Sequence, residues 1–167
     1  ASLVSLTLTP LQIYKIKKIN LDTDRVDIEG HAILFQSGVY SELPTDISET
    51  EALAVLDVCG APAHTEKICS LNQTVVIIGG AGKSGILSAY IAKKKVGKNG
   101  KVICLDYSEE ATNRCRNFSF VDHANACDAR QAVQVYELVH KLTEGKMADV
   151  VINVANVPDT EMSSVLA

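Results

Sequence analysis

Three glycines with the spacing G-x-G-x-x-G form the segment of this sequence that says most about chemistry. They are Gly80, Gly82 and Gly85. The apolar β-branched run 74–78 precedes them, and a predicted helix begins at about Ser84. In that setting the first glycine allows a tight turn, the second lets a pyrophosphate approach the backbone, and the third lets the helix pack closely on the strand. The N–H groups at the helix start, near Lys83 and Ser84, would then meet the phosphates. The spacing therefore predicts a dinucleotide-binding loop.

Other interpretations of this loop exist. Gly82-Lys83-Ser84 is similar to the end of a P-loop, but that motif needs a glycine at position 77, where Ile77 stands. The loop is too short to wrap a triphosphate, so we reject an NTPase. A plain strand-to-helix turn would explain one or two of the glycines, but not all three. Two interpretations of Lys83 stay open: its ammonium adds charge beside the phosphates, or its side chain is solvated and only its N–H meets them.

Residues at the ends of later predicted strands could complete the site. Asp106 ends a strand about 20 residues after Gly85, where dinucleotide folds place the acid that binds the ribose hydroxyls. An acid there repels a 2′-phosphate and so favours NAD over NADP. The alternative is an ordinary aspartate that begins a turn. Asp128 could line the adenine pocket or could be the N-cap of the next helix. The other predicted cofactor contacts are Tyr107, Asn153 and Ala155.

The elements that must position these residues alternate between strand and helix from residue 74 onward. The predicted strands are 74–78, 101–106, 118–121 and 148–154, and the predicted helices are 84–96, 108–117 and 128–142. Such alternation implies right-handed βαβ crossovers and a parallel sheet. The expected fold class is α/β, a Rossmann-like parallel sheet with flanking helices, preceded by the edge of a β-rich domain.

Residues 1–43 differ from the rest in pattern. Short apolar runs bounded by Asn, Asp, Gly and Ser predict small antiparallel strands there. Residues 44–73 are predicted to be connecting helices. Ser48 and Glu51 have the spacing of a capping box at the start of a helix over 49–58, and a second helix is predicted from Pro62 to Cys69. The expected domains are therefore 1–43, 44–73 and 74–167.

Composition excludes several classes of function. The chain has 167 residues, of which 47% are hydrophobic and 22% charged, with a net charge of −4. That charge argues against nucleic-acid binding, and no apolar run approaches the roughly 20 residues that span a bilayer. The five cysteines are odd in number and have no C-x-x-C spacing, so neither a disulfide framework nor a metal site is predicted. A cytoplasmic protein is expected.

Several segments carry a family resemblance. They are 3–11, 21–26, 42–44, 52–58, 60–63 and 75–85. Segments 42–44, 52–63 and 75–82 resemble the joint between the two domains of medium-chain dehydrogenases of the zinc-less type. More narrowly, the set resembles the L-erythro-3,5-diaminohexanoate dehydrogenase family. Lys83 and Ser84 are unusual for the wider superfamily, where small or apolar residues are common after the second glycine. The resemblance covers nearly the whole chain.

This resemblance implies a fold and a reaction. A GroES-like domain would precede a six-stranded nucleotide domain, so we expect the chain to be a piece of a larger enzyme or only its ordered part. The implied reaction is NAD-dependent oxidative deamination of L-erythro-3,5-diaminohexanoate, a small-molecule diamino acid, to 5-amino-3-oxohexanoate in lysine fermentation. A homo-oligomer is also expected. The resemblance assigns no catalytic residue here. The alternatives are another medium-chain oxidoreductase of quinone or alcohol reductase type, and a non-catalytic dinucleotide-sensing domain.

Overall fold

The computed structural model describes residues 11–16, 30–35, 44–48, 50–52 and 58–167. The chain divides into two compact units, Ala1–Leu56 and Asp57–Ala167. In the first unit, strand β1 (Leu11–Ile16) pairs antiparallel with β2 (Gly30–Phe35). Antiparallel strands are what the short apolar runs bounded by Asn, Asp, Gly and Ser predicted for this part of the chain. The other strand-like runs in residues 1–43 lie outside the described residues.

The connecting segment contains the predicted capping box. The N–H of Glu51 donates to Ser48 Oγ at 3.2 Å, and the N–H of Ser48 donates to the Glu51 carboxylate at 2.9 Å. Hydrogen bonds from the Ser48 side chain and backbone also lower the pKa of Glu51. Residues 50–52 are helical, whereas residues 49 and 53–57 of the predicted helix lie outside the described residues. The next helix is α2 (Gly60–Ile68), close to its predicted position.

A sheet of four parallel strands forms the centre of the second unit. Along the chain these strands are β3 (Thr74–Ile78), β4 (Lys101–Asp106), β5 (His123–Ala126) and β6 (Val150–Asn153). Their order in the sheet is β5-β4-β3-β6, so β3 has a parallel neighbour on each side. The chain runs outward from β3 to β5 and then returns to the other side of β3 as β6. Sheets of this kind bind ligands beyond the carboxyl ends of their strands, at the point where the strand order reverses.

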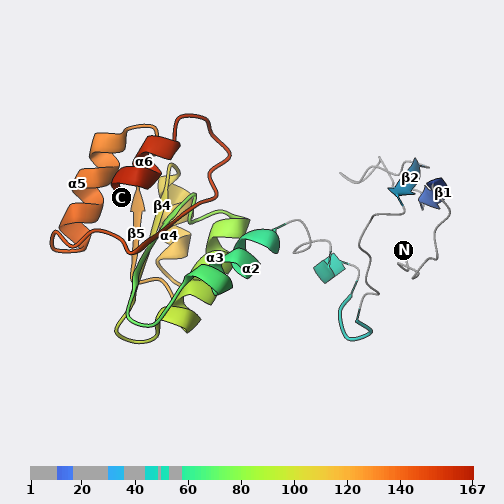
Figure 1. Cartoon of the computed structure of the whole chain (residues 1–167), viewed down its shortest axis with the longest axis horizontal. Coiled ribbons are helices and arrows are strands. Elements are labelled where there is room, and N and C mark those ends of the chain that lie inside the picture. The colour runs from blue at the N-terminus through green and yellow to red at the C-terminus, as the bar shows by residue number, and fades with distance from the viewer. Residues whose placement is uncertain (1–10, 17–29, 36–43, 49, 53–57) are drawn as a thin grey trace. The chain divides into compact units, whose positions relative to one another are not determined.

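Helices cover both faces of this sheet (Figure 1). They are α3 (Lys83–Val96), α4 (Glu109–Cys115), α5 (Ala132–Leu142) and α6 (Glu161–Leu166). Val75 and Ile77 of β3 pack in one apolar cluster with α3 and α4, whereas Val76 and Ile78 pack in a second cluster with α5. Because successive side chains of a strand point to opposite faces, a strand buried on both faces must be apolar throughout.

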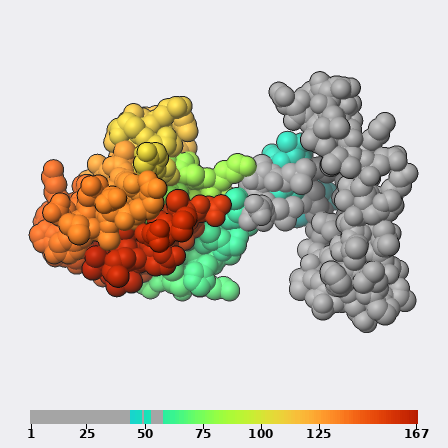
Figure 2. Space-filling view, turned by 90° about the horizontal axis from the view of Figure 1, so that it is seen from above, coloured from blue at the N-terminus to red at the C-terminus, as the bar shows by residue number. Residues whose placement is uncertain are grey.

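The C-terminal residues pack on the face of the sheet that α5 covers. In the space-filling view the C-terminal segment (red) lies against α5 (orange) (Figure 2). Ala167 belongs to the same buried cluster as Val135 and Val139 of α5, and its carbonyl accepts a hydrogen bond from the N–H of Ala148 at 3.0 Å. These contacts join the end of the chain, just after α6, to α5 and to the residues before β6.

The third strand of the sheet corrects the sequence-based prediction. Residues 118–121, predicted as a strand, form turns, and β5 begins only at His123. Phe118 stacks on Phe120 at 5.0 Å between ring centroids, and Phe120 meets Tyr90 of α3 edge-on at 5.5 Å. The aromatic run therefore packs against a helix and only imitates a strand. The strand itself, with the sequence His-Ala-Asn-Ala, carries little apolar signal.

Candidate functional site

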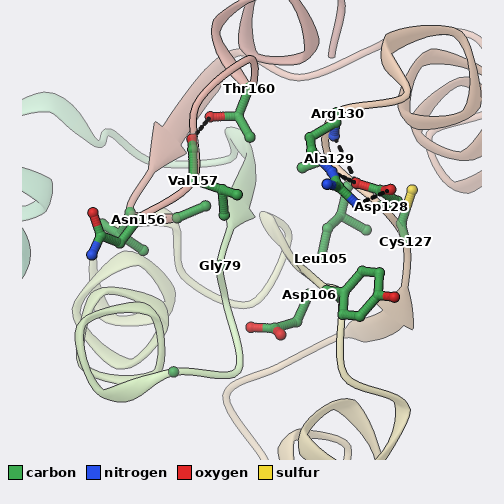
Figure 3. A pocket seen from close by; sticks show the side chains of 14 residues that line it. Gly79, Leu105, Asp106, Cys127, Asp128, Ala129, Arg130, Asn156, Val157 and Thr160 are labelled. Atoms are coloured by element: carbon green, nitrogen blue, oxygen red, sulfur yellow. Dashed lines mark hydrogen bonds and ion pairs between the residues drawn. The ribbon is translucent and has the colours of Figure 1, made fainter.

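A cavity of about 410 Å³ lies at the carboxyl ends of the parallel strands. Figure 3 shows its two sides: the loop after β6, with Asn156, Val157 and Thr160, and the segment after β5, with Asp128 and Arg130. Gly79 and Leu105, from the ends of β3 and β4, lie between them. The cavity thus occupies the position that the strand order favours for a ligand.

The structure brings five of the predicted site residues to this cavity. They are Gly82, Asp106, Tyr107, Asp128 and Ala155. The other five predicted residues do not line it: Gly80, Lys83, Ser84, Gly85 and Asn153. Lys83 and Ser84 begin α3, with Lys83 exposed and Ser84 half-buried. Gly80 and Gly85 lie in the close packing of the glycine loop, and Asn153 holds the loop after β6 by hydrogen bonds.

The glycine loop begins with Gly79, just before the three glycines of the motif, and Gly79 and Gly80 are required for different steric reasons. Gly79 has a φ of +77°, and a Cβ atom there would lie 2.9 Å from the backbone nitrogen of Ala155. Gly80 has no positive φ, but its Cβ would lie 2.6 Å from the Cβ of Cys104 in β4. The left-handed backbone conformation therefore belongs to Gly79, which the G-x-G-x-x-G spacing does not include. Gly80 instead lets the loop lie directly on β4.

Gly82 and Gly85 differ in the space around them: Gly85 is tightly packed, whereas Gly82 is open. A Cβ at Gly85 would lie 2.6 Å from the carbonyl carbon of Gly80 and closer still to the carbonyl oxygen of Gly79, so α3 packs on the loop with no room for a methyl group. A Cβ at Gly82 would find only the carbonyl oxygen of Gly79 within 4 Å among the described residues, at 3.5 Å. Gly82 is exposed and lines the cavity. The free space at Gly82 is therefore available to a ligand.

Asp106 joins the end of β4 to the glycine loop. Its Oδ2 accepts the N–H of Ala81 at 3.1 Å, and its Oδ1 accepts the N–H of Ser108 at 3.2 Å. The N–H groups of Gly79 and Gly80 both donate to the carbonyl of Leu105, at 2.8 and 2.9 Å. These bonds fix the loop against the strand end and orient the Asp106 carboxylate at the cavity.

Asp128 is held in an ion pair with Arg130. Nε and Nη2 of Arg130 donate to the two carboxylate oxygens of Asp128 at 2.9 and 2.8 Å, and the N–H of Arg130 donates to Oδ1 at 3.0 Å. The side-chain and then the backbone hydrogen bonds from Arg130 lower the pKa of Asp128. The N-cap of α5 is Gln131. The alternative in which Asp128 caps that helix is therefore wrong.

Asn153 supports the wall of the cavity formed by the loop after β6. Its Nδ2 donates to Thr160 Oγ1 at 2.9 Å and to Ser164 Oγ at 3.0 Å, and its Oδ1 accepts the N–H of Ala155 at 3.1 Å. Thr160 in turn donates to the carbonyl of Val157 at 3.3 Å. The Asn153 side chain thus holds the loop in place through these bonds.

Sequence reasoning missed Arg130 and the cavity residues of the loop after β6, Asn156, Val157 and Thr160. Neither belongs to a motif. The available signal was topological: every loop that leaves the carboxyl end of a parallel strand reaches the same edge of the sheet. Applied to β5 and β6, that rule would have placed the segments that follow both strands in the predicted site.

Metal and membrane signals are absent from the described part of the chain. No three His, Cys, Asp or Glu side chains gather there as a metal ion would require. Among the described residues, no helix has the length and apolar character needed to cross a membrane. The ionisable side chains that line the cavity are two aspartates, a tyrosine, a cysteine and an arginine.

Comparisons with known proteins agree with this architecture. Residues 1–44 match the family described as the L-erythro-3,5-diaminohexanoate dehydrogenase N-terminal domain. L-erythro-3,5-diaminohexanoate dehydrogenase of Acetoanaerobium sticklandii is 49% identical over 166 residues, and that of Fusobacterium nucleatum is 46% identical. Each match covers 99% of this chain and 48% of the relative. The chain therefore spans about half the length of the curated relatives it matches.

Two solved structures show the same fold. A mycobacterial protein solved as a complex with NADPH has a TM-score of 0.65 at 19% identity, covering 82% of this chain and 40% of that one. A quinone oxidoreductase of Pseudomonas syringae has a TM-score of 0.63 at 19% identity, covering 81% and 40%. The predicted α/β fold class is thus confirmed.

Proposed function

Because this chain is related to the L-erythro-3,5-diaminohexanoate dehydrogenases over nearly its whole length, we propose that it is part of an enzyme with that activity. The identity of 49% over 166 residues carries the proposal. It extends through both units, whereas a shared nucleotide fold alone would account only for the second. The proposed reaction is the NAD-dependent oxidative deamination of L-erythro-3,5-diaminohexanoate to 5-amino-3-oxohexanoate, a step of lysine fermentation.

The cavity has features that suit NAD. The open side of Gly82 would receive the pyrophosphate next to the start of α3, where the backbone N–H groups of Lys83, Ser84 and Gly85 are not used by the first helical turn. The Asp106 carboxylate would accept hydrogen bonds from the ribose hydroxyls of the adenosine half. Tyr107 and Asp128 would flank the adenine, and Ala155 would face the nicotinamide ribose, with Asn153 holding that loop.

In the proposed reaction NAD accepts the hydride, and the protein binds and orients the dinucleotide. When bound, NAD supplies the acceptor for a hydride from the carbon that carries the 3-amino group of the substrate. The substrate loses that hydride, with its two electrons, and a proton from the amine, which leaves an imine. Water then hydrolyses the imine, which releases ammonia and leaves the ketone without a further change of oxidation state. The described residues bind and orient the dinucleotide in this scheme.

The proposed activity predicts a specific stoichiometry. We expect the purified full-length protein to form NADH and ammonia in equal amounts from L-erythro-3,5-diaminohexanoate and NAD. The reverse reaction should oxidise NADH only when both ammonia and 5-amino-3-oxohexanoate are present. Absorbance of NADH and an enzymatic ammonia assay measure both directions. Oxidation of NADPH by a quinone, with no turnover of the diamino acid, would instead support the quinone reductase alternative.

Asp106 is expected to set the preference for NAD. Its charge should repel the 2′-phosphate, so NAD should bind at least about tenfold more tightly than NADP, a difference of about 1.4 kcal/mol. Asp106→Ser should narrow that gap. Asp106→Asn serves as the matched variant, because its amide oxygen can still accept the N–H of Ala81 while the charge is gone. Calorimetric titration with each dinucleotide measures both effects, and equal affinities in the unmodified protein would refute the assignment.

A further inference from the structure

We propose that Asp128 is a second determinant of cofactor specificity, which acts by keeping Arg130 away from the 2′-phosphate of NADP. The inference rests on the proposed function, since it concerns the same dinucleotide cavity. It assigns a role to an arginine that belongs to no sequence motif.

Among the described residues that line the cavity, Arg130 is the only lysine or arginine. Its side chain is 51% exposed, whereas that of Asp128 is 25% exposed. The cavity also contains Asp106, at the end of the neighbouring strand β4. Figure 3 shows Asp128 and Arg130 together on one side of the cavity, joined by their hydrogen bonds. A cation therefore stands where the adenosine end of the dinucleotide is expected.

A free arginine in this position would favour NADP. Its planar guanidinium presents paired N–H donors that match phosphate oxygens, and an arginine near the strand-end acid is a common way to accommodate a 2′-phosphate. In this structure Nε and Nη2 already donate to both oxygens of Asp128, at 2.9 and 2.8 Å. The pair thus occupies those donors and cancels the charge that would attract the phosphate.

Asp128 also has a structural role, from which the specificity role must be separated. Its Oδ1 accepts the N–H of Arg130 at 3.0 Å, and its carbonyl accepts the N–H of Gln131 at 2.9 Å, which shapes the turn before α5. Damage to that turn would weaken NAD and NADP binding alike. Release of Arg130 would instead change the ratio of the two affinities, so the ratio is the informative quantity.

The test is Asp128→Asn in the full-length protein. Asparagine keeps an oxygen for the N–H of Arg130 but loses the charge that holds the guanidinium. We expect the ratio of NADP affinity to NAD affinity to rise at least about fivefold, whatever common loss the change at the adenine side of the cavity causes, measured by calorimetric titration with each dinucleotide at low salt. The gain should shrink as salt rises, because surface charge interactions are screened.

The matched control adds Arg130→Gln to Asp128→Asn. If Arg130 is the group that binds the 2′-phosphate, this double variant should lose the gain in relative NADP affinity. The inference is overturned if Asp128→Asn leaves the ratio of NADP affinity to NAD affinity unchanged, or if the raised ratio persists in the double variant. If the unmodified protein binds neither dinucleotide, the proposed function fails and the inference falls with it. A failure confined to the Asp128 variants leaves the proposed function intact.

Discussion

Replacing Gly82 with valine is expected to abolish NAD binding and to leave the protein folded. The branched side chain would project into the one open space of the glycine loop, where the pyrophosphate must approach the backbone. A loss of at least about a hundredfold in affinity, or about 2.7 kcal/mol, should be seen in calorimetric titrations. Because the cause is steric, the loss should be the same at low and high salt.

The backbone at Gly82 makes this variant a clean test. Its φ of −81° and ψ of 175° are extended values that valine adopts without strain. The midpoint of thermal unfolding should therefore fall only slightly, by the cost of a valine at the N-cap of α3. Gly60→Ala is the matched control, because among the described residues nothing beyond its chain neighbours and its own helix lies within 4 Å of a Cβ at that glycine, and it does not line the cavity. Normal NAD binding by Gly82→Val would show that the phosphate site is misplaced, and the dehydrogenase proposal would lose its main physical support.

The sequence predicted best the two central strands, because a strand buried on both faces has to consist of apolar residues. The strand over 101–106 has the predicted bounds, and so does the strand over 74–78, since strands buried on both faces must be apolar throughout. The strand β5 was misplaced because it lies at the edge of the sheet, where only Ala124 is fully buried. There the aromatic pair Phe118 and Phe120 offered a stronger apolar signal than the strand itself.

The candidate site could be predicted only where spacing reflects a backbone requirement. The position of Gly82 follows from the motif, and so does the tight packing at Gly85. The need for a glycine at Gly79 was not predictable from the motif, because it comes from a positive φ and from the close approach of the loop after β6. The pairing of Asp128 with Arg130 was also hidden, since it depends on a turn before α5 that the predicted helix had covered. Contacts between loops from different strands need the assembled sheet.

Gly85→Ala is expected to cause the largest loss of stability among these changes. A single methyl group would collide with the main chain at Gly79 and Gly80, which cannot rotate away as a side chain could. Helix α3 would have to move off the loop, although Ala89, Ala92 and Val96 are fully buried in the cluster that joins it to the sheet. Overpacking in a core typically costs about 1–3 kcal/mol, and we expect about 3 kcal/mol or more for Gly85→Ala because the backbone must shift.

Urea unfolding of the parent, Gly85→Ala and Gly82→Val distinguishes the two roles assigned to the loop. Gly85→Ala should unfold at a clearly lower urea concentration with a similar slope, which marks a change in stability and not in the surface exposed. Gly82→Val should unfold at nearly the same urea concentration as the parent and yet fail to bind NAD. If Gly85→Ala were as stable as the parent, α3 could not be packed on the loop as described. If both variants lost stability equally, Gly82 would be a structural glycine as well, and its loss of binding could no longer be attributed to the space reserved for the pyrophosphate.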